Sequence, residues 1–561
     1  MAVRDGQSWW LPEPGAAAAE LTIGGLLEQA VADTPAAAAV VVSGYEQPEL
    51  NARWTYAELG RRAERLARAL AAAGVAAGQT VAVWAPNVPQ WLVAEFAVAR
   101  AGAVLVTVNP TYRADEVRYV LHDSGAVACL LWPRFGRWDL AAELATVRPS
   151  LPALRHVVSL GEPAEGAAGL AEFLAAAAEA DGERVAARAA AVRPADVAQI
   201  QYTSGTTGRP KGAALTHRGL VANAMQSNAV WRIGPQDRWC NPMPLFHTAG
   251  CGMLALGTVA ARAAHVMLVR FDADATLDAV ERERCTVLET VPTMLTALLD
   301  RQRERRADLS ALRLVGTSGA PVPPDLGERC AAEWGVPLRV LYGSTEVSPT
   351  VSATALDEPG DLGWTTVGRP LPATEARVTD PVTGAVCPPG VPGEIQVRGY
   401  QVMRGYHNRP DASAAAISGD GWYATGDLAS MDSDGYLRVA GRLRDMIIRG
   451  GENLYPAEIE QRLRQHPGVA DAAVIGVPDP FFGEEACAVI TVRDGHDGLD
   501  GQTVRAWMRE RVTHQKVPRY VLVADALPQT ASGKVQKFLL RQQVTALGLP
   551  PAQDRAGGAT R

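Results

Sequence analysis

A ten-residue segment rich in glycine and hydroxyl side chains, Thr203–Gly212, directly follows the apolar stretch Val197–Tyr202. Its three glycines let the backbone turn N–H groups toward an anion, its hydroxyls add donors, and Arg209 and Lys211 add positive charge. The order Lys-Gly, with no Ser or Thr after it, is not that of a P-loop. We expect a phosphate-holding loop at the end of a strand, outside the P-loop NTPase class. The alternative is a flexible surface loop, which such a composition also permits.

The chain has 561 residues, more than one ordinary core accommodates, so roughly three to four domains or subdomains are expected. Charged residues make up 20% and hydrophobic residues 47%, as in a globular protein rather than a disordered or fibrous one. The net charge of −7 disfavours a nucleic-acid partner.

Seven cysteines lie far apart in the sequence and include no C-x-x-C pair, so neither a disulfide framework nor a zinc site is indicated. The N-terminus lacks the pattern of a signal peptide, and no stretch of about twenty apolar residues predicts a membrane span. The last three residues are not a peroxisomal address. We therefore expect a cytoplasmic protein.

Helical and strand-like patterns alternate along the first 200 residues. Apolar residues recur at three- and four-residue spacing over Tyr56–Leu70, and the β-branched run Thr80–Trp84 is typical of a strand. Such alternation predicts an α/β sheet covered by helices.

The residue composition and the predicted secondary-structure pattern change along the later parts of the chain. A second α/β stretch covers about 201–360, residues 361–440 are dense in glycine and proline and predict a β-rich subdomain, and a mixed pattern returns after 440. We therefore expect a large N-terminal domain, 1–440, with subdomains at about 21–200, 201–360 and 361–440, and a small α+β domain, 441–547. The tail 548–561 is expected to be disordered.

Four further polar motifs follow the glycine-rich segment. In order, they are Tyr342–Glu346, Thr425–Asp427, Gly441–Asp445 and Ser532–Lys534. With these motifs the chain resembles the adenylate-forming superfamily of acyl-CoA synthetases, adenylation domains and luciferase, and most closely its medium-chain acyl-CoA synthetase branch. The resemblance extends from about Leu21 to Leu547 and matches five motifs in order, so it is far more specific than any one loop.

This resemblance implies activation of a carboxylic acid by ATP. A carboxylate is a poor electrophile, and attack on the α-phosphate gives an acyl-adenylate and pyrophosphate. The phosphate charge then has to be screened by a metal ion and cations. The implied co-substrates and cofactor are ATP, Mg²⁺ and coenzyme A.

The resemblance assigns the glycine-rich segment to the β- and γ-phosphates of ATP. Tyr342 offers a flat face for adenine, and Gly343 permits the close approach of a stacked ligand. The opposite wall of the base pocket is assigned to Gly319, Ala320 and Pro321. The segment's expected ATP-binding residues are Thr203, Ser204, Gly205, Thr206, Thr207, Gly208 and Lys211.

Thr345 can donate to the α-phosphate, and Glu346 is a hard oxygen ligand suited to Mg²⁺. Asp427 can accept from both ribose hydroxyls, and the family places Arg442 near the same ribose. Taken alone, these motifs also fit a loop with a solvated glutamate and a simple turn. Lys534, an ordinary loop lysine by itself, is assigned the catalytic role in the first half-reaction, beside Thr345 and Glu346.

In this family the small C-terminal domain pivots between an adenylating pose and a thioester-forming pose. The resemblance makes Arg444 the hinge candidate and assigns Gly450 and Gly451 to the tunnel for the CoA thiol. A hairpin turn is the alternative explanation of the two glycines.

The expected acyl pocket holds small or apolar residues, with His247 as the exception. It consists of His247, Thr248, Gly250, Cys251, Thr317 and Val347. An uncharged aliphatic or aryl tail of short to medium size is expected. His247 is either a gate ring against the acyl group or a structural histidine, and Cys251 is expected to be a pocket wall rather than a nucleophile.

The primary hypothesis is an acyl-CoA synthetase of fatty acid metabolism, a monomer or homodimer. The runner-up is an adenylating ligase with another acceptor, such as a carrier protein, an amine or a small nucleophile, because the five motifs report mainly the first half-reaction. Luciferase-like oxygenation is a more distant possibility. A non-catalytic nucleotide-binding regulator would predict the loss of Lys534 or Glu346, and both are present.

Overall fold

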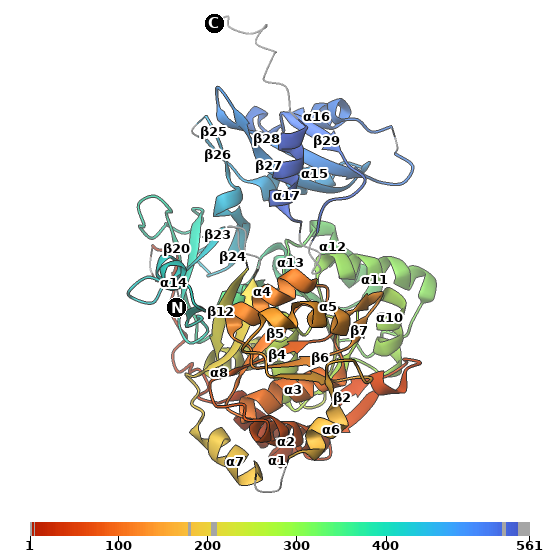
Figure 1. Ribbon diagram of the computed structural model, residues 1–561. Coiled ribbons are helices and arrows are strands. Elements are labelled where there is room, and N and C mark those ends of the chain that lie inside the picture. The colour runs from red at the N-terminus through yellow and green to blue at the C-terminus, as the bar shows by residue number, and fades with distance from the viewer. Residues whose placement is uncertain are drawn as a thin grey trace, which may run out of the picture.

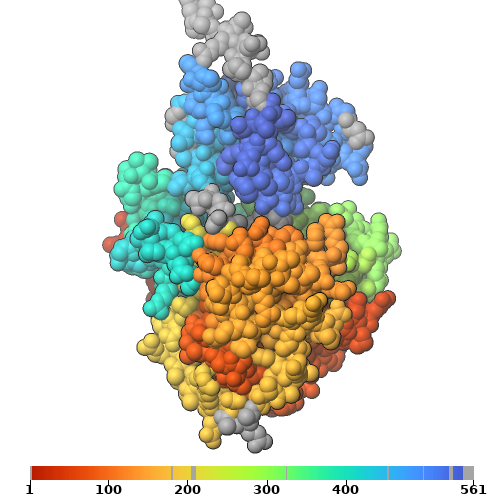
Figure 2. All heavy atoms as spheres, viewed as in Figure 1, coloured from red at the N-terminus to blue at the C-terminus, as the bar shows by residue number. Residues whose placement is uncertain are grey.

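The computed structural model describes residues 3–4, 6–177, 181–203, 210–450, 452–496, 498–529 and 535–547. The expected disordered tail, 548–561, lies outside these residues. Figure 1 shows a large body built from the first four-fifths of the chain and a smaller blue part above it, and Figure 2 shows the same two parts filled by their atoms.

Two large sheets form the body within the described residues. The first runs in the order β10 (Ala168–Gly169), β9 (His156–Ser159), β6 (Ala128–Leu131), β4 (Thr80–Trp84), β5 (Val104–Val108), β11 (Val197–Thr203), β12 (Lys211–Thr216) and β22 (Gly405–Tyr406). The second runs in the order β19 (Arg369–Pro370), β18 (Thr350–Ala353), β17 (Leu338–Gly343), β16 (Leu314–Ser318), β15 (Val287–Thr290), β13 (Arg238–Asn241), β14 (Ala264–Met267), β2 (Ala38–Val42) and β3 (Ala52–Thr55).

Helices cover both faces of each large sheet. The main core packs α1 (Ile23–Asp33), α2 (Tyr56–Ala72), α3 (Pro89–Arg100), α8 (His217–Trp231) and α9 (Leu256–Ala261) between the two sheets. The outer face of the first sheet carries α4 (Ala114–Ser124) and α5 (Leu140–Val147). The outer face of the second carries α10 (Ala273–Arg282), α11 (Pro292–Arg305) and α12 (Pro324–Arg329). The result is an α/β/α/β/α stack.

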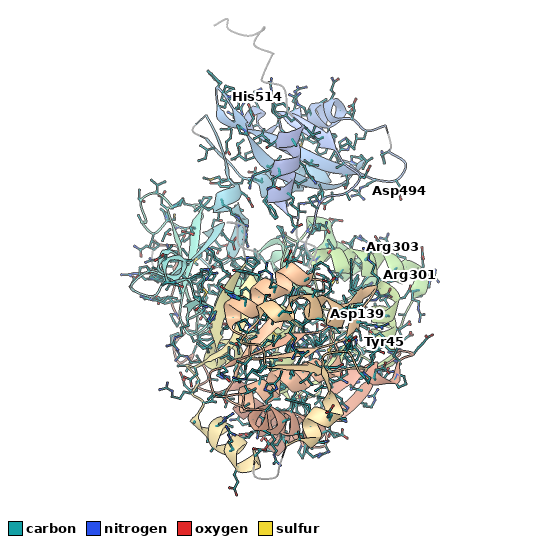
Figure 3. The ribbon with its side chains drawn as sticks, in the orientation of Figure 1. Tyr45, Asp139, Arg301, Arg303, Asp494 and His514 are labelled. Carbon is teal, nitrogen blue, oxygen red and sulfur yellow. The ribbon has the colours of Figure 1, made fainter. Side chains whose placement is uncertain are left out.

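Local sequence explains the predicted elements. α2 begins where Thr55 and Glu58 form a reciprocal capping box, which satisfies two N–H groups of the first turn. β4 covers the predicted residues Thr80–Trp84 and is buried throughout, because its alternate side chains enter the cores on the two faces of the sheet. Figure 3 shows the side chains that fill these layers, with Arg301 and Arg303 on the outer helix α11.

A third, antiparallel sheet and the smaller part complete the fold. The third sheet runs in the order β1 (Trp9–Trp10), β20 (Glu375–Thr379), β21 (Gly393–Arg398), β23 (Tyr423–Met431) and β24 (Leu437–Arg442). The sheet of the smaller part runs in the order β26 (Glu452–Leu454), β25 (Ile447–Arg449), β28 (Gly483–Val492) and β27 (Val469–Asp479), and β29 (Tyr520–Val523) also pairs with β28. Three helices pack on this sheet: α15 (Pro456–Arg464), α16 (Gly501–Arg509) and α17 (Lys537–Ala546).

Shorter elements connect these layers. They are β7 (Arg134–Phe135), β8 (Trp138–Asp139), α6 (Leu170–Ala175), α7 (Asp181–Ala191), α13 (Leu362–Thr365), α14 (Pro410–Ala416), and the short helical turns η1 (Pro48–Leu50), η2 (Arg148–Ser150), η3 (Ala249–Ala255), η4 (Cys330–Trp334), η5 (Thr345–Val347), η6 (Leu443–Asp445) and η7 (His514–Lys516).

The sheets do not follow the expected subdomain ranges 21–200, 201–360 and 361–440. β2 and β3 belong to the second sheet, β12 and β22 belong to the first, and β24 runs to Arg442. Both the parallel pair β2–β14 and the antiparallel pair β12–β22 join strands far apart in the chain, so neighbours in a sheet need not be neighbours in sequence. The sheet that carries Asp427 therefore ends two residues beyond the expected boundary at 440.

The expected fold class, α/β with a large N-terminal part and a small α+β C-terminal part, is confirmed. Among the described residues, no helix combines the length and the apolar character needed to cross a membrane.

Candidate active site

Three distant motifs meet at one carboxylate. Tyr342, at the end of β17, donates from Oη to Asp427 Oδ2 at 2.8 Å. Arg442 lies opposite Asp427 in the β23–β24 register and places Nε 3.0 Å from Oδ1. The antiparallel pairing of β23 with β24 thus fixes the ion pair, and the tyrosine arrives from the second large sheet. The structure therefore brings three of the predicted residues together.

The carboxylate of Asp427 raises the pKa values of its two partners in this triad, Tyr342 and Arg442. Burial raises the pKa of Tyr342 well above its ordinary value, and the nearby Asp427 carboxylate raises it further. The same carboxylate raises the pKa of Arg442. Tyr342 therefore stays a neutral donor and Arg442 a cation. A carboxylate offers about four lone-pair sites, so Asp427 keeps acceptor capacity for a bound hydroxyl.

The predicted base-pocket walls lie at the same sheet edge. Gly319 follows β16, which runs parallel to β17, and Ser318 stands in register with Leu341. Gly319 has a φ of 80°, a conformation that favours glycine. A Cβ on Gly343 would lie 1.9 Å from the carbonyl oxygen of Pro349, so no larger residue fits there. The carboxyl ends of neighbouring parallel strands are where α/β sheets bind ligands.

A second polar group forms around Tyr406, which the sequence analysis did not single out. Tyr406 donates from Oη to Glu346 Oε1 at 3.0 Å, and Lys211 Nζ lies 5.1 Å from the centre of its ring. Glu346 comes from η5 and Lys211 opens β12. The backbone N–H of Met403 also donates to the Glu346 carbonyl at 2.8 Å. Because β22 has only two residues, no local pattern in the sequence marked Tyr406.

The flanks of the glycine-rich segment are fixed by strand pairing. Thr203 ends β11, Lys211 begins β12, and the two residues are antiparallel partners. The predicted residues Ser204, Gly205, Thr206, Thr207 and Gly208 lie outside the described residues, as do Gly451 and Lys534.

The expected acyl residues gather beside Thr345. Thr248 Oγ1 donates to Thr345 Oγ1 at 3.2 Å, and Val347 follows in the same short turn. Thr248 lies immediately before η3, which contains Gly250 and Cys251. Thr248, Gly250, Cys251, Thr317 and Val347 are all buried. The ring of His247 lies 4.3 Å from that of Phe246.

Backbone packing fixes this acyl side. A Cβ on Gly250 would lie 2.1 Å from the carbonyl oxygen of Pro244, so the second residue of η3 must be glycine for the helical turn to pack against Pro244. Burial raises the pKa of Cys251 well above its ordinary value. Its thiol therefore stays protonated at neutral pH, as a wall residue would.

A buried polar chain behind Cys251 was also missed. Gln201 Nε2 lies 3.2 Å from Cys251 Sγ and 2.7 Å from Gln199 Oε1, and Gln199 donates to Glu95 Oε1 at 2.8 Å. Burial raises the pKa of Glu95 to about 8. Two glutamines alternating along the otherwise apolar β11 were the available sequence signal. Glu289, which accepts from Ser318 Oγ at 3.1 Å, is a second buried carboxyl with a pKa raised by burial to about 8.

The junction to the smaller part follows the triad directly. Arg444 is an exposed residue of η6, and its neighbour Asp445 pairs with Arg541 of α17 at 3.0 Å. Gly450 is exposed with a φ of 59° and donates from its N–H to the carbonyl of Phe482 at 2.8 Å.

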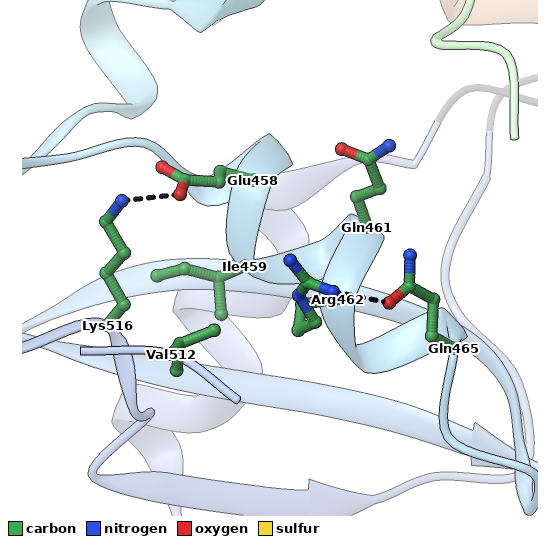
Figure 4. A pocket seen from close by; sticks show the side chains of 7 residues that line it. All are labelled: Glu458, Ile459, Gln461, Arg462, Gln465, Val512 and Lys516. Carbon is green, nitrogen blue, oxygen red and sulfur yellow. Dashed lines mark hydrogen bonds and ion pairs between the residues drawn. The ribbon is translucent and has the colours of Figure 1, made fainter. Parts of the chain in front are cut away.

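A surface hollow in the smaller part is drawn in Figure 4. It is lined by Glu458, Ile459, Gln461, Arg462, Gln465, Val512 and Lys516. Two of these lining residues, Lys516 and Glu458, form an ion pair. The lining contains none of the predicted site residues.

Two family models match the chain. The model of the AMP-binding enzymes matches residues 27–407, and that of the AMP-binding enzyme C-terminal domain matches residues 458–534.

Known proteins are similar over nearly the whole length. A feruloyl-CoA synthase of Amycolatopsis sp is 40% identical over 87% of this chain and 94% of its own. The mitochondrial medium-chain acyl-CoA ligase ACSF2 of Danio rerio is 36% identical over 88% of this chain and 84% of its own. The crystal structure of ATP-bound MatB from Rhodopseudomonas palustris aligns with a TM-score of 0.81 and 32% identity, over 94% of this chain and 100% of that chain.

The matched models cover well over half of the chain; Tyr342, Glu346 and Lys211 lie within the first matched range, and Asp427 and Arg442 lie between the two ranges. The chain therefore belongs to the family of AMP-binding, adenylate-forming enzymes.

Proposed function

We propose that the protein activates a carboxylic acid with ATP and transfers the acyl group to coenzyme A. The observation that carries the proposal is the meeting of Tyr342, Asp427 and Arg442 beside the Glu346–Tyr406–Lys211 group. It joins a base-sized aromatic face from the second large sheet to a ribose acceptor and a cation from the third sheet. The similarity to proteins named as acyl-CoA ligases and synthases supports the same reaction.

In the first half-reaction, a carboxylate oxygen of the acid attacks the α-phosphorus of ATP. The bond from this phosphorus to the bridging oxygen breaks, and pyrophosphate leaves with the electron pair. Adenine lies between the ring of Tyr342 and the Gly319–Pro321 wall, and Asp427 accepts from the ribose hydroxyls with Arg442 beside it. Thr345 donates to the α-phosphate, and Lys211 and the glycine-rich segment bind the leaving phosphates. Lys534 contacts the attacking carboxylate and the α-phosphate.

Mg²⁺ fits the residues present. Among the described residues no three His, Cys, Asp or Glu side chains form a metal-binding group, and Glu346 offers a single carboxylate near the phosphate side. Mg²⁺ in nucleotide enzymes is commonly held by one or two carboxylates together with substrate phosphates, which matches this donor set. When bound, it would screen the phosphate charge. Tyr406 holds the Glu346 carboxylate in one orientation for that contact.

In the second half-reaction, the CoA thiolate attacks the acyl carbonyl carbon, the bond to the phosphate oxygen breaks, and AMP leaves. We assign the access route for the thiol to Gly450 and Gly451 and the pivot between the two poses to Arg444. The N-terminal part through Arg442 and the part 443–547 then act as two domains, with the break two residues after the boundary expected from the sequence.

The acid is expected to have an uncharged aliphatic or aryl tail of short to medium size. The expected pocket residues other than His247 are buried, and none of the set carries charge other than what His247 can hold. The names of the medium-chain and feruloyl relatives include both tail types. A cytoplasmic location is our inference from the seven unpaired, buried cysteines.

Pyrophosphate exchange tests the assignment. Replacing Lys534 with Ala should abolish acid-dependent ATP–pyrophosphate exchange and leave thioester formation from supplied acyl-AMP largely intact. Lys516→Ala, which removes a surface ion pair of the same part, is the matched control and should change neither. Equal loss in both half-reactions would contradict the role of Lys534.

The acceptor and the pivot are tested separately. Arg444→Pro should spare exchange and block thioester formation, because proline limits the backbone change at the pivot.

Gly451→Leu should slow thioester formation alone. Strong pyrophosphate release that CoA does not accelerate, across a panel of aliphatic, aryl and amino-bearing acids, would favour a non-CoA acceptor.

A further inference from the structure

Both ends of the glycine-rich segment are bonded to the last two turns of one helix, α4. Tyr202, next to the end of β11, donates from Oη to Asp123 Oδ2 at 2.8 Å. Tyr119, one turn earlier on α4, donates from Oη to the carbonyl oxygen of Pro210 at 2.8 Å. The two rings meet edge to face, with centroids 6.1 Å apart. Tyr202, just before the last residue of β11, and Pro210, just before the first residue of β12, are therefore held by the same helix.

One arginine from a distant part of the chain closes this support. Arg409 Nη2 lies 2.7 Å from Asp123 Oδ1 and 3.2 Å from Tyr119 Oη. Asn408 adds a bond from Nδ2 to the Asp123 carbonyl at 2.9 Å. The Asp123 side chain is 11% exposed, so its charge is largely removed from water, and Arg409 is the cation that the structure pairs with it. An ion pair of this kind is costly to break because one charge stays behind unpaired.

The same corner of the chain also reaches the metal candidate. Arg409 lies three residues after Tyr406, the residue that orients Glu346, and its N–H donates to the Tyr406 carbonyl at 3.1 Å. Ser413 of α14 fixes the corner, since its Oγ accepts from the Tyr406 N–H and donates to the Arg409 carbonyl, both at 2.8 Å. One rigid turn thus links Glu346 to both flanks of the glycine-rich segment.

The charge of Asp123 gives the pair a second effect. An unneutralised carboxylate beside a site for a polyanion would repel the ligand, and a paired one would not. Burial raises the pKa of Tyr202, and the neighbouring Asp123 carboxylate raises it further, so the tyrosine stays a neutral donor at physiological pH.

We infer that Arg409 and Asp123 are positioning residues for ATP: together they hold Tyr202, Pro210 and the Tyr406–Glu346 pair in the arrangement that the phosphates need. The inference rests on the proposed function. It assigns to the pair a selective effect on ATP, exerted through Tyr202, Pro210 and Tyr406, with no contact to the acid or to CoA.

Steady-state pyrophosphate exchange tests this inference. Arg409→Ala is expected to raise the KM for ATP about tenfold, on the scale of measured couplings within one network. The KM for the acid and the kcat at saturating ATP should change less than about threefold, as should thioester formation from supplied acyl-AMP. Direct titration with ATP in the absence of acid should show the same loss of affinity.

Three further variants separate positioning from folding. Asp123→Asn keeps the shape and removes the charge, so it should raise the KM for ATP as Arg409→Ala does, but by less, because no unneutralised carboxylate remains. The double variant Asp123→Asn/Arg409→Ala should be no worse than either single one, because the two residues act as a unit. Arg409→Lys keeps the charge without the fork that reaches Tyr119 as well, and should recover part of the affinity.

The matched control is Arg118→Ala, which removes an exposed pair with Asp115 at 3.2 Å on the same helix and should leave the KM for ATP unchanged. A KM for ATP within twofold of wild type in Arg409→Ala would overturn the inference. So would an equal loss in the reaction of supplied acyl-AMP, or the absence of any rescue by lysine. Failure of the wild-type protein to exchange pyrophosphate with any acid would instead contradict the proposed function.

Discussion

The nucleotide side and the acyl side of the candidate site are built by different forces. On the nucleotide side, Tyr342, Asp427 and Arg442 form a connected polar group that crosses two sheets. On the acyl side, Cys251 and Gly250 are buried and fixed by close backbone packing around η3. A charged ligand needs pre-oriented partners, because reorganising charges on binding is costly. An apolar tail needs only a shaped space, so the acyl side can be varied without disturbing the ATP side.

The largest effect is expected from removing the Asp427 carboxylate, which contacts both Tyr342 and Arg442. Asp427→Ala leaves Arg442 and the Tyr342 hydroxyl without their shared partner, and should lower kcat/KM for ATP by between about thirtyfold and several thousandfold, since truncating one partner of such a pair costs about 2–5 kcal/mol. Exchange kinetics measure the effect. Arg438→Ala, which removes the exposed pair with Asp432 at 2.8 Å beside the same β23–β24 turn and leaves the Asp432 bonds to the N–H groups of the turn, should be nearly neutral.

The corresponding test of the acyl side is steric. Gly250→Ala places a methyl group against the Pro244 carbonyl and should displace η3, lowering kcat/KM for the acid about thirtyfold, an effect of about 2 kcal/mol typical of overpacking. The KM for ATP should stay within about twofold. Gly234→Ala, where a Cβ meets open space, is the control. Equal damage to the kinetics of ATP and acid would show that the two sides are not independent.

A milder change examines the wall of the acyl side. Cys251→Ser keeps a small side chain beside Gln201 but makes it more polar, so we expect the KM for an apolar acid to rise less than about fivefold with kcat unchanged, on the scale of one altered pocket contact. Kinetics across acids of increasing chain length measure this. A complete loss of turnover would instead make the thiol a reactive group.

The smallest expected effect concerns the buried carboxyl Glu289. Burial raises its pKa from the ordinary 4.5 to about 8, so the folded protein holds a proton there that the unfolded chain releases. The contribution of this bound proton to the free energy of unfolding is therefore fully present below about pH 4.5 and is lost as the pH rises from there through about 8. Glu289→Gln carries no such proton and should lose less stability over this range.

Thermal unfolding of wild type and Glu289→Gln at pH 5 and pH 8.5 checks this sign. The melting temperature of the variant relative to wild type should be higher at pH 8.5 than at pH 5, by about 2 °C. Ser418→Ala, which removes a hydrogen bond from an exposed carboxylate, Asp420, should shift both conditions equally. A constant difference for Glu289→Gln would mean that the carboxyl is already ionised in the folded protein.

Sequence alone predicted what is encoded locally. The amphipathic pattern of Tyr56–Leu70 and the β-branched run Thr80–Trp84 each specify an element through their own residues, and both were found as α2 and β4. Sheet order could not be obtained this way, because β2 finds its partner β14 across more than 200 residues.

Within the site, too, residues in local motifs were predicted, and residues that depend on distant partners were not. Tyr342, Asp427 and Arg442 were predicted because they lie in recognisable motifs, and the structure places them in contact. Tyr406 and Glu95 were missed, because their importance comes from partners on other sheets and helices and not from their neighbours in sequence.

The interleaved sheets have a consequence for biosynthesis. β1 pairs with β20, β2 with β14, and β12 with β22, so each sheet of the body waits for a strand encoded far downstream. At about 5–20 residues per second, a ribosome needs roughly 20–90 s to reach Arg442 after starting the chain. During that time β1 and β2 have left the exit tunnel without β20 and β14, the strands that will cover their edges. Folding of the body is thus largely a post-translational event, and a cell that makes this protein must keep those open edges from pairing with wrong strands until the last sheet closes.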